Sequence, residues 1–514
     1  MAPRPRRRIL VIGGGLAGLA AAATAASKDC EVLLFEAEEK LGGLAGSFCR
    51  DGYLWDKGAR AVEDSGVLKP FLRRLGLGAA VDFIPESVSL GVEGKLLTID
   101  GDPAIRDWFA LLQEFHPTRK NALVALLEET QKAVAASDTL YSGSNPLFSS
   151  LGAMLAKTLW WNLRNKGLFE RISNREDSLA IPLTQLLQRL DTGEDLIRLI
   201  AQPFFPGTSV FFGLGYFRLY RDYYYPRQGM GSLAGAIENY IKGKGEKLFT
   251  GTRIESIIAE NGKARGVRLQ NGDTFEADSI IAAQDAKTLL RLLPHHSLPA
   301  DFNEKIEQGK PGESIFTLYL EVDKDPESIR PRGLAHAIIS PDRAGLALLS
   351  PEGYFTSSSI ELGIPAMRNS NLAPPGKTGI IISAPASYRR WTAFAQAGGR
   401  VYTEAKEKAS SMLVDALSIH MPWLKGRIEN SFSASPLSPE RHSSNSGGSI
   451  TGWSHIPEEC PSERDFRRFA SSVESPIPNL YRAGHWCFTP AGIPVAIMTG
   501  TLSATMACLK LGRF

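Results

Sequence analysis

The hydrophobic pattern near the N-terminus predicts a strand, a turn and a helix. Residues 9–12 form a short, uninterrupted apolar run, which is typical of a buried parallel strand. A glycine-rich turn and an alanine-rich run suited to a helix follow at once, and residues 32–35 form a second apolar run. The order strand, helix, strand indicates an α/β fold with a parallel sheet.

Further along the chain the period of the pattern changes. Residues 232–242 have helical periodicity, whereas residues 247–283 alternate, with turns at Asn261-Gly262 and Asn271-Gly272. This alternation predicts a small antiparallel meander. Residues 498–511 read as a helix near the C-terminus.

Two apolar segments lie outside these elements. In residues 147–172, leucines recur at four-residue spacing beside Trp160-Trp161, and Lys157 and Arg164 form a narrow basic stripe. This pattern fits a core helix, or a helix that lies in a membrane interface with aromatic and basic residues at the headgroups. Residues 200–225 are rich in aromatic side chains and fit either the lining of a tunnel or ordinary core packing.

Length and composition narrow the class. A chain of 514 residues is too long for one ordinary core, so we expect two domains. Positive and negative side chains nearly balance, with a net charge of +3, so the charge gives no indication of nucleic-acid binding. The five cysteines contain no Cys-x-x-Cys pair, and the histidines show no helical metal-binding spacing. We therefore expect no disulfide scaffold and no metal, and a reducing compartment.

The first residues also fit an export signal, because Arg6, Arg7 and Arg8 precede an apolar stretch. The glycines within that stretch and the strand-like run after it favour a folded unit instead. The sequence contains no run of about 20 uninterrupted apolar residues, so we expect no membrane-spanning helix. We expect a cytoplasmic protein with peripheral membrane association and leave its oligomeric state open.

The turn after the first strand carries chemistry. Gly13, Gly15 and Gly18 form G-x-G-x-x-G, where the first glycine permits a tight turn, the second lets the backbone approach a pyrophosphate and the third lets helix and strand pack closely. Glu36 ends the second strand, where a carboxylate can bind ribose hydroxyls. A glycine-rich turn alone occurs in many α/β proteins, but this context predicts a dinucleotide, and the acid disfavours NADP.

Later motifs resemble those of known flavoproteins. Lys40, Gly42 and Gly43, together with the stretch DKGAR at 56–60, resemble the FAD-binding pattern of the large group that includes amine oxidases and carotenoid desaturases. The segment 223–286, which contains YYYPRQGMG, and NLYRAGHWCFTPAGIPVAI near the C-terminus resemble the phytoene desaturase family with its carotenoid isomerase and retinol saturase relatives.

The resemblance implies where FAD would lie. Ile254 matches a position whose backbone meets the adenine. The Gly-Ile-Pro turn matches the start of a helix whose N-terminal end faces the flavin, where it would stabilise negative charge. The cofactor-binding residues expected from motif and resemblance are Gly13, Gly15, Leu16, Ala17, Gly18, Glu36, Lys40, Gly42, Gly43, Gly58, Ala59, Arg60, Ile254, Gly484, His485, Ile493, Pro494 and Val495.

Two positions depart from the pattern of the relatives. His485 stands where many relatives have an Asp that holds the ribitol, so its role is open. Ser449 stands where monoamine oxidases carry the cysteine that bonds the flavin, which predicts non-covalent FAD, with Cys487 as the nearby thiol. Arg60 and His485 are candidate catalytic residues. No Ser/His/Asp arrangement and no paired carboxylates are recognisable, which suits chemistry performed by a cofactor.

The resemblance implies a Rossmann-type FAD domain, discontinuous over residues 1–100, 220–295 and 475–514, with an α+β substrate domain from residues 101–219 and 296–474. It implies an oxidoreductase that desaturates, saturates or isomerises C–C or C=C bonds of a long apolar polyene or isoprenoid such as a carotenoid. An amine oxidase on the same fold and a non-enzymatic prenyl-lipid carrier remain alternatives.

Overall fold

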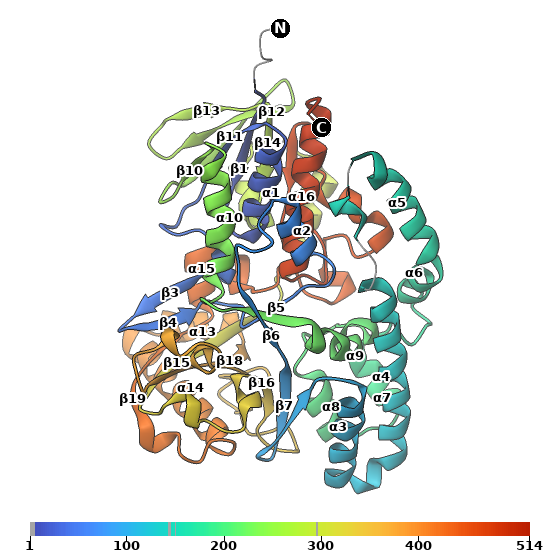
Figure 1. Ribbon diagram of the computed structural model, residues 1–514, viewed down its shortest axis with the longest axis vertical. Coiled ribbons are helices and arrows are strands. Elements are labelled where there is room, and N and C mark those ends of the chain that lie inside the picture. Colours follow the sequence, from blue (N-terminus) through green and yellow to red (C-terminus); the bar gives the residue numbers. More distant parts are fainter. Residues whose placement is uncertain (1–5, 142–144, 150, 295–296, 514) are drawn as a thin grey trace.

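The computed structural model describes residues 6–141, 145–149, 151–294 and 297–513. Figure 1 shows an elongated molecule in which β1 and the end of α16, close to the two ends of the sequence, lie at the same end. That end contains a parallel sheet with its helices. The other end contains a large mixed sheet on one side and a group of helices on the other.

The parallel sheet has five strands in the order β10-β2-β1-β14-β20. Its central strand is apolar on both sides because both faces of the sheet are covered. Ile9 and Val11 face the helices, whereas Leu10 and Ile12 face a small antiparallel sheet. The strands are β1 (Arg8–Ile12), β2 (Glu31–Phe35), β10 (Lys247–Phe249), β14 (Ser279–Ala282) and β20 (Leu480–Arg482).

Two helices from opposite ends of the sequence pack together on this sheet, α1 (Leu16–Ser27) and α16 (Ile493–Lys510). Their approach needs glycine. A Cβ at Gly18 would lie 1.8 Å from the Gly13 carbonyl oxygen, and a Cβ at Gly500 would lie 2.1 Å from the Ala17 carbonyl oxygen. The predicted C-terminal helix is thus present and begins earlier than the pattern of residues 498–511 indicated, at Ile493.

The antiparallel meander is confirmed for three strands, β11 (Ile254–Glu260), β12 (Lys263–Leu269) and β13 (Thr274–Glu276). Its first turn has positive φ at Asn261 and Gly262, as a tight hairpin requires. The expectation was wrong for the flanking runs. β10 and β14 join the parallel sheet, and β14 is buried along its whole length, which suits a strand covered on both faces.

The second large sheet has seven strands in the order β19-β15-β18-β17-β16-β7-β8. One side packs on helices α13 (Tyr388–Gln396) and α14 (Gly399–Ser418) around the fully buried Trp391. The strands are β7 (Val88–Val92), β8 (Lys95–Ile99), β15 (Ser314–Val322), β16 (His336–Ser340), β17 (Ile360–Gly363), β18 (Thr378–Ala386) and β19 (Ile428–Ala434).

The division into two domains stays a prediction at the level of its boundaries. Residues 88–99, which it assigns to the FAD domain, pair in the structure with β16 of the seven-stranded sheet. Several shorter strands and helices pack around these sheets. They are β3 (Ser47–Arg50), β4 (Tyr53–Asp56), β5 (Val62–Glu63), β6 (Phe83–Glu86), β9 (Tyr223–Pro226), α2 (Leu68–Arg74), α10 (Gly231–Gly243), α11 (Ala286–Leu292), α12 (Ala300–Gln308) and α15 (Leu437–Ser443).

A third group of helices packs around an apolar core that also includes residues of β7 and β8. Its members are α3 (Asp102–Phe115), α4 (Lys120–Tyr141), α5 (Leu151–Arg164), α6 (Lys166–Ser173), α7 (Leu183–Arg189), α8 (Glu194–Ala201) and α9 (Val210–Leu219). The predicted single segment 147–172 is broken into α5 and α6 at Asn165. The amide of this buried residue donates to the Trp161 carbonyl oxygen at 2.9 Å, which anchors the break.

The outer face of α5 is not core. The side chains of Leu159, Trp160 and Leu163 are 63%, 58% and 64% exposed. Trp161 is different, because it packs against Phe169 with ring centroids 5.1 Å apart. The core-helix interpretation is therefore wrong for this face. The side chains of Leu151 and Leu155, which belong to the predicted leucine row, lie outside the described residues.

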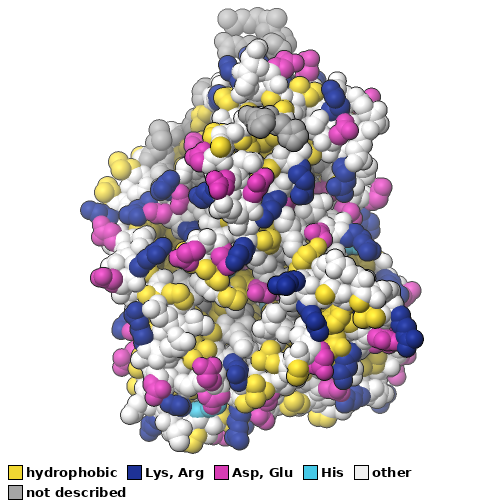
Figure 2. All heavy atoms as spheres, turned by 180° about the vertical axis from the view of Figure 1, so that it is seen from behind, with side chains coloured by type: hydrophobic (Ala, Val, Ile, Leu, Met, Phe, Trp, Pro, Cys, Tyr) yellow, Lys and Arg dark blue, Asp and Glu magenta, His cyan; other side chains and the backbone are white. Residues whose placement is uncertain are grey.

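Among the described residues, α16 is the one helix long and apolar enough to cross a membrane by length and composition, and 56% of it is buried within the protein. Its packing on α1 identifies it as a core helix of the parallel-sheet domain. On the face shown in Figure 2, basic and acidic side chains are interspersed and do not gather by sign.

Candidate functional site

A large cavity lies between the parallel sheet and the rest of the molecule. Its volume is about 1090 Å³, slightly above the range of roughly 300–1,000 Å³ that is usual for ligand pockets. One part is formed by the glycine-rich turn after β1 and by the end of β2. The remainder is formed by the seven-stranded sheet and by aromatic residues of the 200–225 segment.

Most of the residues predicted from motifs meet at this cavity although they are far apart in sequence. Those that line it are Gly13, Gly15, Leu16, Ala17, Glu36, Lys40, Gly42, Gly43, Gly58, Ala59, Arg60, Ile254, Gly484, His485 and Ile493. The cavity wall does not include Gly18, Pro494 or Val495. Gly18 lies behind the wall, where it lets α1 approach the turn, as its place in the motif predicts.

The dinucleotide turn leaves open space where a ligand would run. Gly15 lines the cavity, and a Cβ placed on it would meet nothing within 4 Å. The Glu36 carboxylate at the end of β2 is held in place, because its Oε2 accepts from the Gly14 N–H at 2.6 Å and its Oε1 from the Glu38 N–H at 2.9 Å. A carboxylate has further acceptor sites, so Glu36 can still bind hydroxyl groups.

Two helix N-termini open into the cavity. α1 is preceded by its N-cap residue Gly15 and α16 by Gly492, and neither has a side-chain cap or an acidic residue in its first turn. Both ends therefore present free N–H groups and positive dipole ends to whatever the cavity holds. The loop before α16 is fixed, because the Gly484 N–H donates to Thr499 Oγ1 at 2.9 Å.

These features fit FAD. The open space at Gly15 beside the α1 N-terminus suits a pyrophosphate, and Glu36 beside it suits the adenosine ribose. The second uncapped helix end, at α16, suits a group that gains negative charge on reduction. The geometry accommodates each part of the cofactor that the motifs predicted, although the assignment of individual residues stays a prediction.

Arg60 lines the cavity and also connects two parts of the protein by hydrogen bonds. Its guanidinium donates to the Gly58 carbonyl oxygen at 2.6 Å and to Ser383 Oγ at 2.7 Å, so it ties the DKGAR loop to β18. It is 2% exposed, and its Nε has no partner in the described part of the chain. These contacts position the loop against the second sheet, whereas a direct catalytic role for Arg60 remains a hypothesis.

His485 is partly buried, lines the cavity and packs edge-on against Trp486, with ring centroids 5.5 Å apart. Burial lowers its pKa to about 4, so the imidazole is neutral at pH 7. Among the described residues its ring nitrogens have no hydrogen-bond partner. They are free to bind a cofactor or a substrate in the cavity, and the structure leaves both roles open.

The positions considered for covalent flavin attachment lie away from the cavity wall. Ser449 is fully buried, and its hydroxyl donates to the Gly452 carbonyl oxygen at 2.7 Å. Cys487 is 2% exposed, and burial raises the pKa of its thiol to about 11. Neither side chain is among those that line the cavity. The thiol is also poorly reactive, because the thiolate is the nucleophile.

Sequence reasoning missed the polar groups of the far wall. His336 Nε2 lies 3.0 Å from Glu361 Oε1, across the β16–β17 pair. Burial alone would raise the pKa of Glu361, but the hydrogen bond from His336 and the charges of His336, Arg60 and Arg368 together lower it. A third group, Glu63, also lines the cavity. These residues come from distant strands, and no spacing in the sequence links them.

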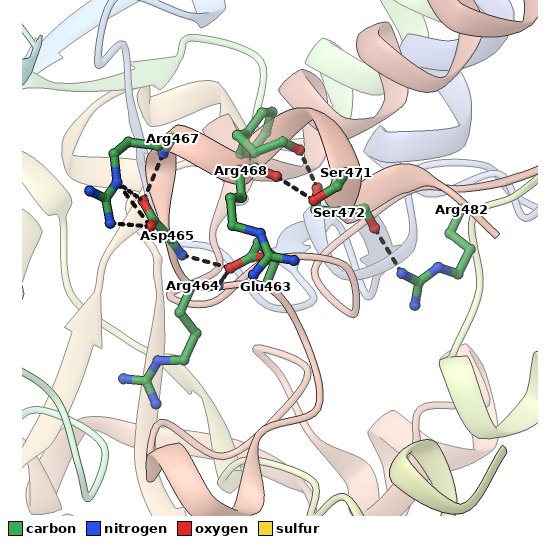
Figure 3. A network of polar contacts seen from close by, with 9 residues as sticks. Glu463, Arg464, Asp465, Arg467, Arg468, Ser471, Ser472 and Arg482 are labelled. Carbon is green, nitrogen blue, oxygen red and sulfur yellow. Dashed lines mark hydrogen bonds and ion pairs between the residues drawn. The ribbon is translucent and has the colours of Figure 1, made fainter. Parts of the chain in front are cut away.

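His455 lines the cavity beside Thr208, with Nδ1 and Oγ1 3.0 Å apart. A polar loop holds it there. Glu463 Oε1 accepts from the backbone N–H groups of Arg464 and Asp465 (Figure 3), and Arg464 Nη1 donates to the His455 carbonyl oxygen at 2.8 Å. Burial, with the nearby charge of Arg464, lowers the pKa of His455 to about 4. The ring is therefore neutral at pH 7.

Comparison with known proteins identifies the group. Residues 16–507 match the family described as flavin containing amine oxidoreductase. The chain belongs to this family. It is an FAD-dependent oxidoreductase, so the carrier alternative is set aside, and the resemblance stated from the motifs is confirmed.

Named relatives at low identity cover almost the whole chain. A chloroplastic prolycopene isomerase of Daucus carota is 25% identical over 98% of this chain and 80% of its own. A lycopene-forming phytoene desaturase of Pseudescherichia vulneris is 24% identical over 97% and 99%. The structure of an oxidoreductase from Methanosarcina mazei superimposes with a TM-score of 0.60 at 16% identity, covering 98% of this chain and 100% of its own, which confirms the fold.

Proposed function

We propose that this enzyme desaturates, saturates or isomerises C–C or C=C bonds of a long apolar polyene or isoprenoid, such as a carotenoid. The observation that carries the proposal is the continuity of the cavity. The same cavity that contains the dinucleotide turn is also lined by a wall of aromatic side chains, Phe204, Phe205, Phe212, Tyr216, Tyr220 and Tyr223. When bound there, FAD supplies the redox-active ring, and the protein supplies binding and orientation.

The aromatic wall suits a flat, apolar ligand. Tyr216 packs edge-on against Phe204, Phe212 and Tyr220, with ring centroids 5.8, 5.3 and 5.2 Å apart. Rings locked by their neighbours form a rigid surface that excludes water and needs little ordering when a polyene binds. The segment 200–225 serves as both lining and core, because other side chains of α9, such as Phe211 and Phe217, belong to the helical core.

Access from a membrane is part of the proposal. Leu159, Trp160 and Leu163 form an exposed apolar surface on α5, and the Arg164 guanidinium lies 5.3 Å from the Trp160 ring centroid. Apolar side chains with adjacent basic groups are typical of helices that lie in a membrane interface. A polyene has almost no solubility in water, so a peripheral enzyme would spare it an aqueous transfer.

The named relatives support the substrate class without deciding the reaction. One is a prolycopene isomerase and another a lycopene-forming phytoene desaturase, at nearly equal identity to this chain. The test is to purify the holoenzyme, extract and identify the lipid that co-purifies, and incubate the enzyme with that lipid. A product of unchanged mass indicates isomerisation, whereas loss or gain of two hydrogen atoms indicates desaturation or saturation. Unchanged polyene in every case contradicts the proposal.

The amine oxidase alternative has its own test, because these enzymes release peroxide when they oxidise amines. Incubation with a panel of primary and secondary amines in air, with peroxide as the readout, separates the two functions. We expect no peroxide above the rate seen without amine. Amine-dependent peroxide would favour the alternative.

A further inference from the structure

Glu63 is a carboxyl group built into the cavity without a cationic partner. It lies on β5, which pairs with β9 so that Glu63 stands opposite Tyr223. It is partly buried and lines the cavity close to the start of α16, since a Cβ at Gly492 would lie 3.4 Å from Glu63 Oε1. In the described part of the chain, no ion pair and no side-chain hydrogen bond to another residue reaches this carboxyl.

The surroundings of Glu63 favour its neutral form. The phenols of Tyr223 on β9, Tyr216 on α9 and Tyr141 on α4 lie within electrostatic range of it, and so does the Asp222 carboxylate. Burial raises the pKa of Glu63 to about 7, the Asp222 charge adds to the rise, and a hydrogen bond from its own backbone opposes it. The uncapped α16 N-terminus also opposes it.

Asp222 itself is fully engaged elsewhere. It pairs with Arg218 at 3.0 Å and accepts from the Ser65 N–H at 3.0 Å. Arg218 is therefore neutralised by Asp222 and does not form an ion pair with Glu63. At neutral pH a large share of Glu63 is a carboxylic acid with a proton to give.

A second carboxyl in the same cavity has the opposite character. Glu361 is ionised, because His336 donates a hydrogen bond to it and the charges of His336, Arg60 and Arg368 hold its pKa low. Its side chain is 41% exposed, toward the cavity. Two carboxyls whose surroundings push their pKa values apart mark the acid and the charge stabiliser of many active sites.

We propose that Glu63 is a catalytic acid–base group that gives a proton to a carbon of a substrate C=C bond and takes one back, which makes isomerisation of a polyene a reaction of this site. The proposal rests on the proposed function. The Glu63 O–H bond breaks as the π pair of one double bond forms a C–H bond, and the positive charge spreads along the polyene. The former double bond then rotates as a single bond. Loss of a proton from the same carbon to the Glu63 carboxylate restores the double bond.

This sequence consumes no oxidant, reductant or other co-reactant, because every proton and electron pair returns to its place. The ionised Glu361 is the group in the cavity that can stabilise the transient positive charge. The aromatic wall keeps water from trapping the cation. The three features line the same cavity, and Glu63 is the member that exchanges the proton.

The decisive experiment is the reaction of a cis polyene with the holoenzyme in D2O. We expect the recovered trans product to carry deuterium, since the proton added to carbon comes from a group in exchange with solvent. Glu63→Gln should lose the deuterium label and slow isomerisation by about 100-fold or more, as expected for removal of a general acid. The matched control is Glu128→Gln, the same change on the exposed face of α4, which should leave rate and label unchanged.

The pH profile gives an independent readout. The acid must be protonated, so the wild-type rate should fall as the pH rises above about 7, in line with the pKa of Glu63. Asp222→Asn removes a negative charge that raises the pKa of Glu63, so this limb should move to lower pH. An asparagine at this position can still accept from the Ser65 N–H. The measurement also serves if Glu63→Gln does not fold.

The outcomes separate the two proposals. Wild-type isomerisation with no deuterium in the product, or a Glu63→Gln enzyme that runs at the wild-type rate, overturns the role of Glu63 and leaves the proposed function standing. An unmoved pH limb in Asp222→Asn does the same. Wild-type enzyme that leaves all polyenes unchanged overturns the proposed function and, with it, this step.

Discussion

Gly500 of α16 lies against Ala17 of α1 so closely that a Cβ on Gly500 would stand 2.1 Å from the Ala17 carbonyl oxygen. This contact sets the distance between the two helices whose N-termini open into the cavity. The absence of a side chain at Gly500 therefore determines both the packing of the two helices and the geometry of the predicted cofactor site.

Gly500→Ala should destabilise the protein and weaken FAD binding. Alanine favours a helix over glycine by about 1 kcal/mol, so a loss of stability must come from the contact with Ala17, where overpacking typically costs about 1–3 kcal/mol. Thermal unfolding and FAD titration measure both effects. The control is Gly243→Ala in α10, where a Cβ meets nothing within 4 Å and stability should be unchanged or higher. Equal behaviour of the two variants would contradict the role of this contact.

Gly15→Val should abolish FAD binding while the fold is kept. A Cβ here meets nothing within 4 Å, so the side chain enters the space assigned to the pyrophosphate. Gly235→Val is the matched control, since a Cβ there also meets nothing within 4 Å but the position does not line the cavity. Flavin absorbance per protein and circular dichroism report on the two properties. Near-normal flavin content in the Gly15 variant would refute the motif assignment.

Glu36→Ala should weaken FAD binding less than Gly15→Val. It removes a charge-assisted hydrogen bond to the ribose, which typically contributes about 1.5–3 kcal/mol to binding. It also leaves the Gly14 N–H without the Glu36 carboxylate as its acceptor. Isothermal titration of the apoenzyme with FAD measures the change. A Kd equal to that of wild type would show that Glu36 only supports the turn.

Stability should fall on acidification between pH 6.5 and 4. The pKa of His455 is lowered from 6.5 to about 4 by burial, so its neutral form stabilises the fold above pH 6.5 and this contribution is lost as the pH falls toward 4. The loss is up to about 3 kcal/mol for a shift of this size. We expect the free energy of unfolding, measured by urea titration at several pH values, to fall less steeply with decreasing pH in His455→Gln than in wild type. The control His442→Gln, at an exposed histidine, should keep the wild-type slope.

Trp160→Glu with Leu163→Glu should sharply reduce co-sedimentation with vesicles of phosphatidylcholine and phosphatidylglycerol, with FAD content intact. Both side chains are exposed, so the change should not disturb the fold, whereas Trp161 packs on Phe169 and is left unchanged. The control is Val401→Glu with Ile419→Glu, two other exposed apolar positions. Wild-type vesicle binding by the α5 variant would place the interface elsewhere.

The strand–helix–strand unit could be predicted because its rules are local. Apolar runs, three glycines and an acid lie within residues 9–36, and each carries its reason in its neighbours. The break between α5 and α6 could not be predicted, because Asn165 lies inside an otherwise helical pattern. The hydrogen bond from its side-chain amide to the Trp161 carbonyl oxygen exists only in the folded helix.

The polar part of the cavity could not be predicted for a related reason. Glu63, His336 and Glu361 reach one wall only after β5, β16 and β17 have taken their places in two different sheets. The state of each carboxyl then depends on burial and on cations such as Arg368, which lie on other elements. Motifs predicted the cofactor site, whereas the groups that would act on a substrate are brought together only by the tertiary structure.

The parallel sheet has a consequence for the order in which the protein matures on the ribosome. β1, β2 and α1 are synthesised early, yet β20 and α16, which complete the sheet and the second helix end at the cavity, come close to the end of the sequence. Domains generally fold as units during synthesis. Here one edge of β14 stays without its partner strand until β20 has been synthesised, and the second helix end at the cavity forms only with α16.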